Sequence, residues 1–274
     1  MKNDRNFNLD QILSNLRDSI DEFQPKLKFP DELKSSIERL VKSLKVFEEN
    51  KIEINIDYDA FKAIGERLNE YTQNVSVHTL LVSRHGWFID LIAPIDMPAN
   101  AYTLFKSGNI KAGDKVIGDY YHEYIDDVFD TLKKRHKRRK FILEDILNGY
   151  KEKNYRMIIP CIFTQIDGIS NDFTKKAFFT KKEKKYNHLP EFSALIKAET
   201  EGFLDYYISP LQNQTPIMVN EKYLGGFPCK FNRHQIIHGS SVSYGNKTNS
   251  LKAISFLKYL SDILTSLKTK GKIA

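Results

Sequence analysis

Apolar residues recur at intervals of three and four along most of this chain, a spacing that places them on one face of an α-helix. Residues 9–23, 31–48, 58–71 and 75–88 each show such a stripe. Glycine and proline, which interrupt helices, number only 13 and 9 in 274 residues. We therefore expect an all-α protein.

The domain organisation is less regular near the N-terminus. The segment KIEINIDYD at 51–59 alternates apolar and polar residues, which predicts either a short strand or an extended linker. Beyond Gly108–Gly113, several amphipathic segments follow in succession, as a helical bundle requires, with a lysine-rich loop at 174–188 between two of them. We expect an N-terminal helical region at 1–110 and a helical bundle at 111–274.

Charge and cysteine content bear on the binding partners and the cellular compartment of the protein. Lys and Arg number 42 against 35 Asp and Glu, a net charge of +7 that favours polyanionic partners but is also ordinary for a basic protein. Cys161 and Cys229 are far apart and form no Cys-x-x-Cys pair, which fits a reducing compartment. The first ten residues lack the apolar segment of a signal peptide, and the apolar stretch MIIPCIF is too short to span a bilayer. We expect a cytoplasmic protein that does not associate with a membrane.

The segment 231–239 holds the densest group of reactive side chains. A glycine at 239 predicts that the helix carrying Arg233 ends at His238, where the helix dipole favours a protonated imidazole. His234 and His238 are four residues apart and share a helical face, whereas Arg233 points about 140° away from His238. Helical geometry therefore pairs the two histidines rather than Arg233 with His238.

Three interpretations of this segment compete. His-x3-His is a familiar spacing of metal ligands, but two imidazoles are not a complete site and the motif contains no further ligand, so we expect no metal. A structural motif is the second interpretation, with Arg233 paired to an acid and His238 at a helix end. An arginine followed by a histidine at this spacing arises by chance in a chain of this composition, so the spacing alone does not identify a catalytic site.

The third interpretation depends on a longer pattern. The stretch NRHQIIHG, followed by a Tyr-Gly pair and by NSLKAISFLKYL, resembles the C-terminal signature of the HEPN superfamily, which is an arginine, usually a polar residue, and a histidine after four to six intervening residues. Arg233 and His238 match the arginine and the histidine, and His234 occupies the polar position, commonly filled by Asn or Asp. IPCIFTQIDGI at 159–169 is similar to an earlier bundle helix of such proteins. The resemblance covers about 113–274.

This resemblance implies a HEPN-like bundle and a metal-independent endoribonuclease without a cofactor, acting as a homodimer in which both motifs face one cleft. His238 is then the general acid or base, Arg233 stabilises the phosphate, and His234 orients one of them or shares the proton transfer. The resemblance also implies a toxin or abortive-infection effector in antiviral defence, with an antitoxin or defence-system partner. The alternatives are a non-catalytic HEPN-like module that binds RNA, nucleotide or protein, and a metal-dependent hydrolase.

Five residues are candidates for supporting roles. Asn232 directly precedes the motif. Asp167 is either a partly exposed acid beside a helix bend or an acid that pairs with the motif across the bundle. Tyr244 either binds a phosphate or closes a turn, and Asn249 is a suitable N-cap for the last helix. Lys252 then falls in the first turn of that helix, where a cation is disfavoured, so we expect a phosphate or an acidic neighbour there.

A basic run, KKRHKRRK at 133–140, would cover every face of a helix over two turns and is expected at an exposed helix end or connection. Either it contacts the RNA backbone or it is a solvated charge run. The candidate RNA-binding residues are Lys133, Lys134, Arg135, Lys137, Arg138 and Arg139.

Overall fold

The computed structural model describes residues 74–179, 191–199, 203–269 and 271 of the chain. The chain divides into two compact units, Met1–Ile54 with Leu91–Asp96, and Asn55–Asp90 with Met97–Ala274. The expected helices at 9–23, 31–48 and 58–71 and the extended segment at 51–59 lie outside the described residues. The architecture described below is that of the second unit.

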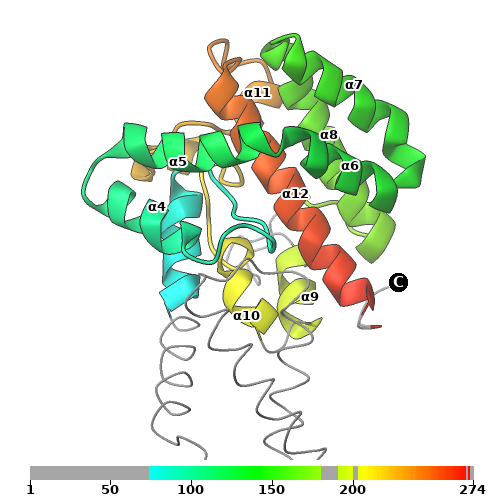
Figure 1. Ribbon diagram of the computed structural model, residues 1–274, viewed down its shortest axis with the longest axis horizontal. Coiled ribbons are helices and arrows are strands. Elements are labelled where there is room, and N and C mark those ends of the chain that lie inside the picture. Colours follow the sequence, from blue (N-terminus) through cyan, green and yellow to red (C-terminus); the bar gives the residue numbers. More distant parts are fainter. Residues whose placement is uncertain (1–73, 180–190, 200–202, 270, 272–274) are drawn as a thin grey trace, which may run out of the picture. The chain divides into compact units, whose positions relative to one another are not determined.

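Every regular element in the described part of the second unit is a helix, and no strand occurs there, which confirms the expected all-α class (Figure 1). A first helix covers residues 74–84. The elements that follow are α4 (Met97–Lys106), α5 (Ile110–Glu123), α6 (Ile125–Arg135), η1 (Lys137–Arg139), α7 (Lys140–Lys151), α8 (Tyr155–Thr174), α9 (Glu191–Glu199), α10 (Phe203–Tyr207), η3 (Ser209–Leu211), η4 (Glu221–Gly226), α11 (Arg233–Ile237) and α12 (Lys247–Thr269).

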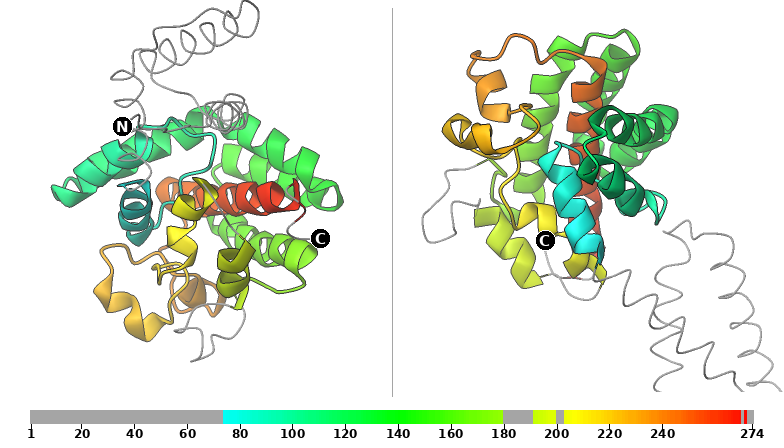
Figure 2. Two further views of the ribbon diagram at one scale, coloured as in Figure 1. Left: turned by 90° about the horizontal axis from the view of Figure 1, so that it is seen from below. Right: turned by 90° about the vertical axis from the view of Figure 1, so that its left-hand side faces the viewer.

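Helix α12 is the central element of this unit. It packs along α8, α5 and α6, and these helices surround it in both further views (Figure 2). All fifteen residues of 250–264 are buried, on every face of the helix. The 3-4 apolar pattern predicts one buried stripe, and the stripe is indeed buried, but the polar residues between its members are enclosed as well. A helix covered on all sides is the core of the bundle rather than one of its amphipathic walls.

Segments distant in sequence supply the packing around α12. The Phe88 ring stacks on Phe256 at 4.2 Å between centroids, and the Phe88 N–H donates to Ser255 Oγ at 3.2 Å. From the other direction, the Phe178 ring meets Phe256 edge-on at 5.1 Å, and Tyr259 Oη donates to the carbonyl of Tyr207 at 2.7 Å. Aromatic side chains of two separate segments and a backbone carbonyl of a third thus meet one helix.

Residues before the expected domain boundary contribute to this core. Trp87 and Phe88 are at most 1 % exposed and follow the helix at 74–84. The boundary expected at Gly108–Gly113 runs from the turn after α4 into the first turn of α5, and these two helices pack against each other. It therefore lies inside the second compact unit, and the observed division comes earlier in the chain.

Helix α12 carries charged side chains into the core. Lys258 is fully buried, and its Nζ donates to both carboxylate oxygens of Asp262 at 2.8 and 2.7 Å and lies 3.9 Å from Asp90 Oδ1. Asp262 also accepts from Arg135 at the end of α6. Two bases and two acids therefore neutralise one another inside the bundle, because an unpaired charge in that environment would be very costly.

Removing one member of this network should destabilise the fold strongly. Lys258→Met leaves Asp262 and Asp90 without their shared cation, and we expect the free energy of unfolding to fall by about 3 to 5 kcal/mol, as measured by denaturant titration. A matched control is Lys115→Met, which removes the lysine of the i,i+4 ion pair with Asp119, where both side chains are more than 60 % exposed. That variant should stay within about 0.5 kcal/mol of the parent. Equal effects of the two variants would contradict the role assigned to the buried network.

Candidate functional site

Asn232 fixes the start of α11. It is buried, its side-chain oxygen accepts from the Gln235 N–H at 3.0 Å, and its amide group donates to the carbonyls of Pro216 and Val219 at 2.6 and 2.9 Å. The first contact is an N-cap, and the other two tie the cap to the preceding loop. Asn232 therefore holds the next residue, Arg233, in a defined place.

Helix α11 ends as the sequence predicts. His238 is its C-cap, and Gly239 has φ +76°, in the left-handed region that glycine adopts without strain. The backbone N–H of His238 donates to the His234 carbonyl at 3.1 Å. The helix has only five residues, so the arginine and the histidine of the motif stand at its two ends.

The two histidines form a pair, as their spacing indicates. The rings of His234 and His238 lie 4.3 Å apart between centroids, with planes at 55°. His238 is exposed and His234 is half-buried. Two imidazoles that lie side by side can accept protons from the same bound group or donate protons to it. The described residues contain no cluster of three or more His, Cys, Asp or Glu side chains able to hold a metal ion.

Arg233 lies between an acid and an aromatic ring. Its Nη2 is 3.9 Å from Asp167 Oδ2 on α8, and its Cζ is 4.8 Å from the centre of the Phe179 ring. The pairing of Asp167 with the motif across the bundle is thus confirmed, although the distance is too long for a hydrogen bond. The Nε of Arg233 is buried and has no hydrogen-bond partner in the described part of the chain.

Asp167 is held from two directions. Its Oδ1 accepts the backbone N–H of Phe179 at 2.7 Å. Burial raises the pKa of its carboxyl group, and the Phe179 N–H and the charge of Arg233 act against that rise. Ionisation of this carboxyl group is therefore less favourable than that of an aspartate in water, while Arg233 favours its charged form.

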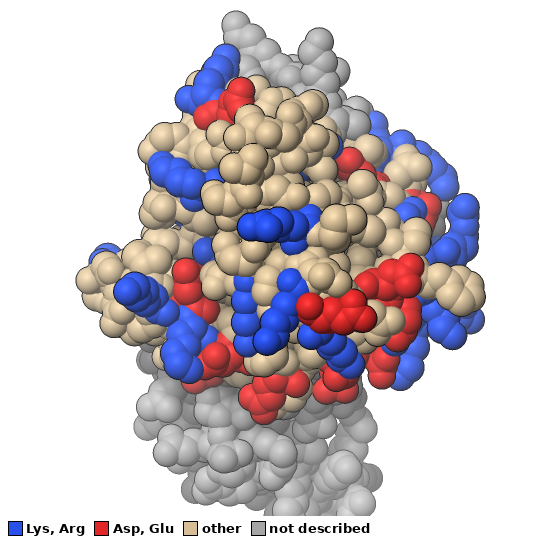
Figure 3. Space-filling model, turned by 90° about the horizontal axis from the view of Figure 1, so that it is seen from above, with Lys and Arg blue, Asp and Glu red and all other residues tan. Residues whose placement is uncertain are grey.

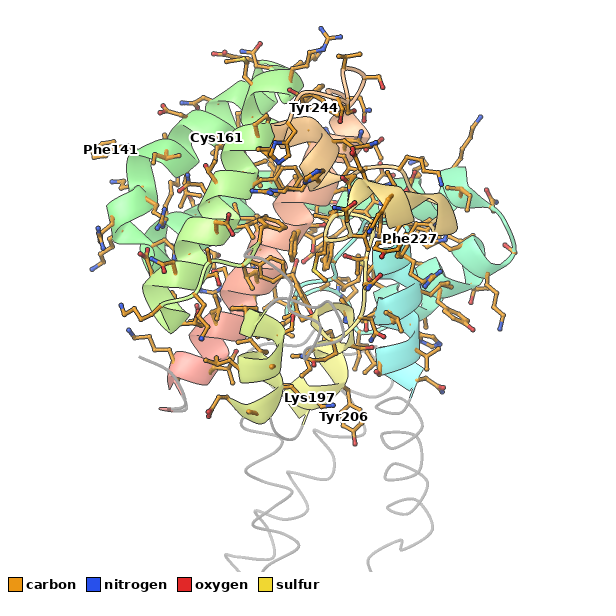
Figure 4. All side chains as sticks on the ribbon, turned by 180° about the vertical axis from the view of Figure 1, so that it is seen from behind. Phe141, Cys161, Lys197, Tyr206, Phe227 and Tyr244 are labelled. Carbon is orange, nitrogen blue, oxygen red and sulfur yellow. The ribbon has the colours of Figure 1, made fainter. Side chains whose placement is uncertain are left out.

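Tyr244 closes the loop between α11 and α12 onto α8 (Figure 4). Its Oη donates to the carbonyl of Arg156 at 3.0 Å. That carbonyl has no i+4 donor within the helix, because the residue four positions later is Pro160, which lacks an N–H. Gly245 lies against Arg156, where any Cβ would collide with the arginine side chain. The Tyr244 hydroxyl thus anchors the loop to another helix, and a role in binding phosphate stays a prediction.

The prediction that Asn249 caps the last helix is wrong. Helix α12 begins at Lys247, and the cap is Asn246, whose Oδ1 accepts the Asn249 N–H at 2.9 Å. Asn249 instead donates to the Tyr244 carbonyl at 2.9 Å. Two asparagines three residues apart offer the same capping chemistry, and the preceding turn decides between them.

Lys252 accordingly lies in the second turn of α12, whereas the sequence predicts that it lies in the first turn. The expected acidic neighbour is confirmed, because its Nζ lies 3.1 Å from Asp114 Oδ1 on α5. The same oxygen accepts from Trp87 Nε1 at 2.7 Å. Lys252 is only 5 % exposed, so it is a paired charge of the core rather than a surface contact.

Half of the predicted RNA-binding run is engaged in ion pairs. The run forms the connection from α6 through η1 to α7, as expected, but its side chains do not all face solvent. Lys133 Nζ lies 2.6 Å from Glu144 Oε2, and Arg135 pairs with the buried Asp262. Arg139 donates to Asp172 Oδ2 at 3.0 and 2.9 Å and to Gln165 Oε1 at 3.1 Å.

Lys133, Arg135 and Arg139 therefore have a structural role, and their contact with RNA stays a prediction. Each meets an acid on another element or turn of the bundle, which a solvated run does not require. Arg139 also lies directly over Gly168, where a Cβ would collide with the guanidinium group. Lys134, Lys137 and Arg138 remain exposed. The face of the molecule shown in Figure 3 carries basic and acidic side chains interspersed, not a patch of one sign.

The chain matches no protein-family model, no curated protein and no solved structure. Across the described residues, every helix falls short of the length and apolarity that crossing a membrane would require.

One feature of the site and one of the bundle core give little signal in the sequence. Phe179 stands in the lysine-rich stretch assigned to a loop, and nothing there indicates that its ring meets Arg233. The pair Lys258 and Asp262 is visible as an i,i+4 match within an apolar run, but the same match is typical of exposed helix faces.

The buried histidine of the basic run should make stability depend on pH. His136 Nε2 hydrogen-bonds to Ser261 Oγ at 2.7 Å, and burial, with the charges of Arg135 and Arg139, lowers the pKa of His136 to about 4. The unfolded chain binds the proton near the ordinary pKa of 6.5, so the native state loses stability as the pH falls from about 6.5 towards 4.

We expect His136→Gln, which keeps a hydrogen-bonding side chain, to reduce that loss by up to about 3 kcal/mol in denaturant titrations at several pH values. The control is Thr103→Val on α4, an exposed substitution that changes no titratable group, so its pH profile should parallel that of the parent. If the profile of His136→Gln also parallels the parent, the histidine is not the titrating group.

Proposed function

We propose that this protein is a metal-independent endoribonuclease of the HEPN type, with Arg233 and His238 as its catalytic residues and His234 as their partner. The observation that carries the proposal is α11 itself. This one-turn helix presents a half-buried arginine at its start, restrained by an acid and a ring, and an exposed histidine at its end, whose ring lies beside that of His234.

These side chains supply the groups that RNA transesterification needs. The 2′-hydroxyl attacks its own phosphodiester and loses a proton, and the 5′-oxygen of the next nucleotide leaves and gains one. A neutral imidazole accepts the first proton and an imidazolium donates the second, so His234 and His238 suffice in number. Arg233 offers N–H donors and a positive charge to the phosphorane oxygens.

The two ends of α11 favour a composite site in a homodimer. Five residues of α-helix rise about 7.5 Å, and Arg233 and His238 point in different directions from the axis. A two-fold axis near α11 brings Arg233 of one subunit towards His238 of its partner. An RNA strand bound across that axis meets both residues, in a cytoplasmic toxin or defence effector restrained by an antitoxin or system partner.

The alternative is a non-catalytic HEPN-like module that binds RNA, nucleotide or a protein partner. It is favoured by the structural use of several candidate residues, since Asn232, Tyr244 and Asn249 bond to backbone groups and Lys252 is buried against an acid. The two proposals differ in one property, which is whether RNA is cut.

The catalytic proposal predicts RNA cleavage that persists in excess chelator. Substituting His238→Ala removes a proton donor or acceptor, so we expect the cleavage rate to fall by at least about a hundredfold in gel assays with the purified protein. His122→Ala, which removes an exposed histidine of α5, should leave the rate unchanged. RNA binding without cleavage by the parent protein would favour the alternative, and undiminished cleavage by His238→Ala would remove the histidine from the mechanism.

The remaining exposed bases of the run should bind the RNA backbone. Each base that neutralises a phosphate of a single strand contributes about 0.7 to the slope of log affinity against log salt, so the triple change of Lys134, Lys137 and Arg138 to Ala should lower the slope by about 2. Fluorescence anisotropy at several salt concentrations measures the slope. The charge-matched control replaces Lys106, Lys111 and Lys115 on α4 and α5. If the control lowers the slope equally, the decrease in net charge explains the effect and the run is not a binding surface.

A further inference from the structure

Arg233 is held by a contact that leaves most of its hydrogen-bonding capacity available. Asp167 Oδ2 lies 3.9 Å from its Nη2, and the centre of the Phe179 ring lies 4.8 Å from its Cζ. Its side chain is 25 % exposed and its buried Nε has no partner among the described residues. The guanidinium group is therefore restrained in position, while its N–H donors are not all used in hydrogen bonds.

The ring of Phe179 is itself fixed in place. Helix α8 ends where Lys175 adopts the left-handed conformation, and the chain then turns back along the helix. The Phe179 N–H donates to Asp167, and its ring meets Phe163 and Phe178 edge-on, at 88° and 82°. Phe178 is fully buried. One face of the Phe179 ring is thereby presented to Arg233.

An aromatic ring and a carboxylate hold a cation in different ways. A carboxylate at hydrogen-bonding distance takes up N–H donors and cancels the charge, whereas a ring attracts the cation through its quadrupole and accepts no ordinary hydrogen bond. Asp167 contributes attraction from a distance and anchors the backbone of Phe179 through its other oxygen. The arrangement suits a cation that must remain available to an anionic group.

We propose that Phe179 is the positioning residue of Arg233, and that it orients the guanidinium group towards the phosphate of the substrate. The inference rests on the proposed ribonuclease function. It assigns a role to a side chain from the turn after α8, which the Arg-x4-6-His pattern does not include.

Exchange of the ring for an alkyl side chain tests the proposal. In Phe179→Leu, we expect the cleavage rate at saturating RNA to fall by about three- to thirtyfold, with little change in KM, because the ring acts on orientation rather than on RNA binding. Phe179→Tyr keeps the ring and should retain most of the rate. In the Arg233→Ala background, Phe179→Leu should cause no further loss. Cleavage by Phe179→Leu at the parent rate would overturn the inference.

A second measurement does not depend on RNA cleavage. The Nε–Hε resonance of Arg233, identified by its loss in Arg233→Lys, should move in Phe179→Leu when the ring is removed. Titration with inorganic phosphate should shift this resonance, with several-fold weaker affinity in Phe179→Leu than in Phe179→Tyr. If the parent does not cut RNA, the ribonuclease proposal fails, but the phosphate titration still tests the positioning role of Phe179. Equal phosphate affinities of Phe179→Leu and Phe179→Tyr would overturn that role.

Discussion

The enclosure of α12 is the constraint on which the rest of the second unit depends. A helix buried on every face must bring a partner for each charge that it carries, and here the partners come from three places. Asp114 on α5 meets Lys252, while Asp90 and Arg135 meet the pair at 258 and 262. Sliding α12 by one turn would separate these charges. The buried network therefore selects one register for the surrounding helices, which apolar packing alone would define less sharply.

The same constraint reaches the candidate site through α8. That helix packs along α12 and carries Asp167 on one of its turns, and the chain after its end returns to place Phe179. Arg233 is then met by two groups from a single supporting element, while Asn232 sets its backbone from the other direction. The short helix α11 has little stability of its own, so its geometry is imposed by these neighbours.

Local signals were sufficient for part of this structure. The end of α11 at His238, the pairing of the two histidines and the all-α class follow from glycine chemistry and helical spacing, which act within a few residues. Partners across the bundle could not be predicted in this way. Arg135 and Asp262 are 127 residues apart, and the basic run looks identical in sequence whether its bases meet water or acids. For α12, the 3-4 apolar pattern indicates one buried face, but it does not indicate that neighbouring helices cover the opposite face as well.

The hydrogen bond between Tyr244 and Arg156 joins residues 88 positions apart, at a turn of α8 where Pro160 has removed the internal donor. The loop after α11 thus supplies a donor that the helix cannot provide at the i+4 position. A proline within one helix creates an attachment point for another segment, and the loop that follows the histidine pair is fixed to α8 there.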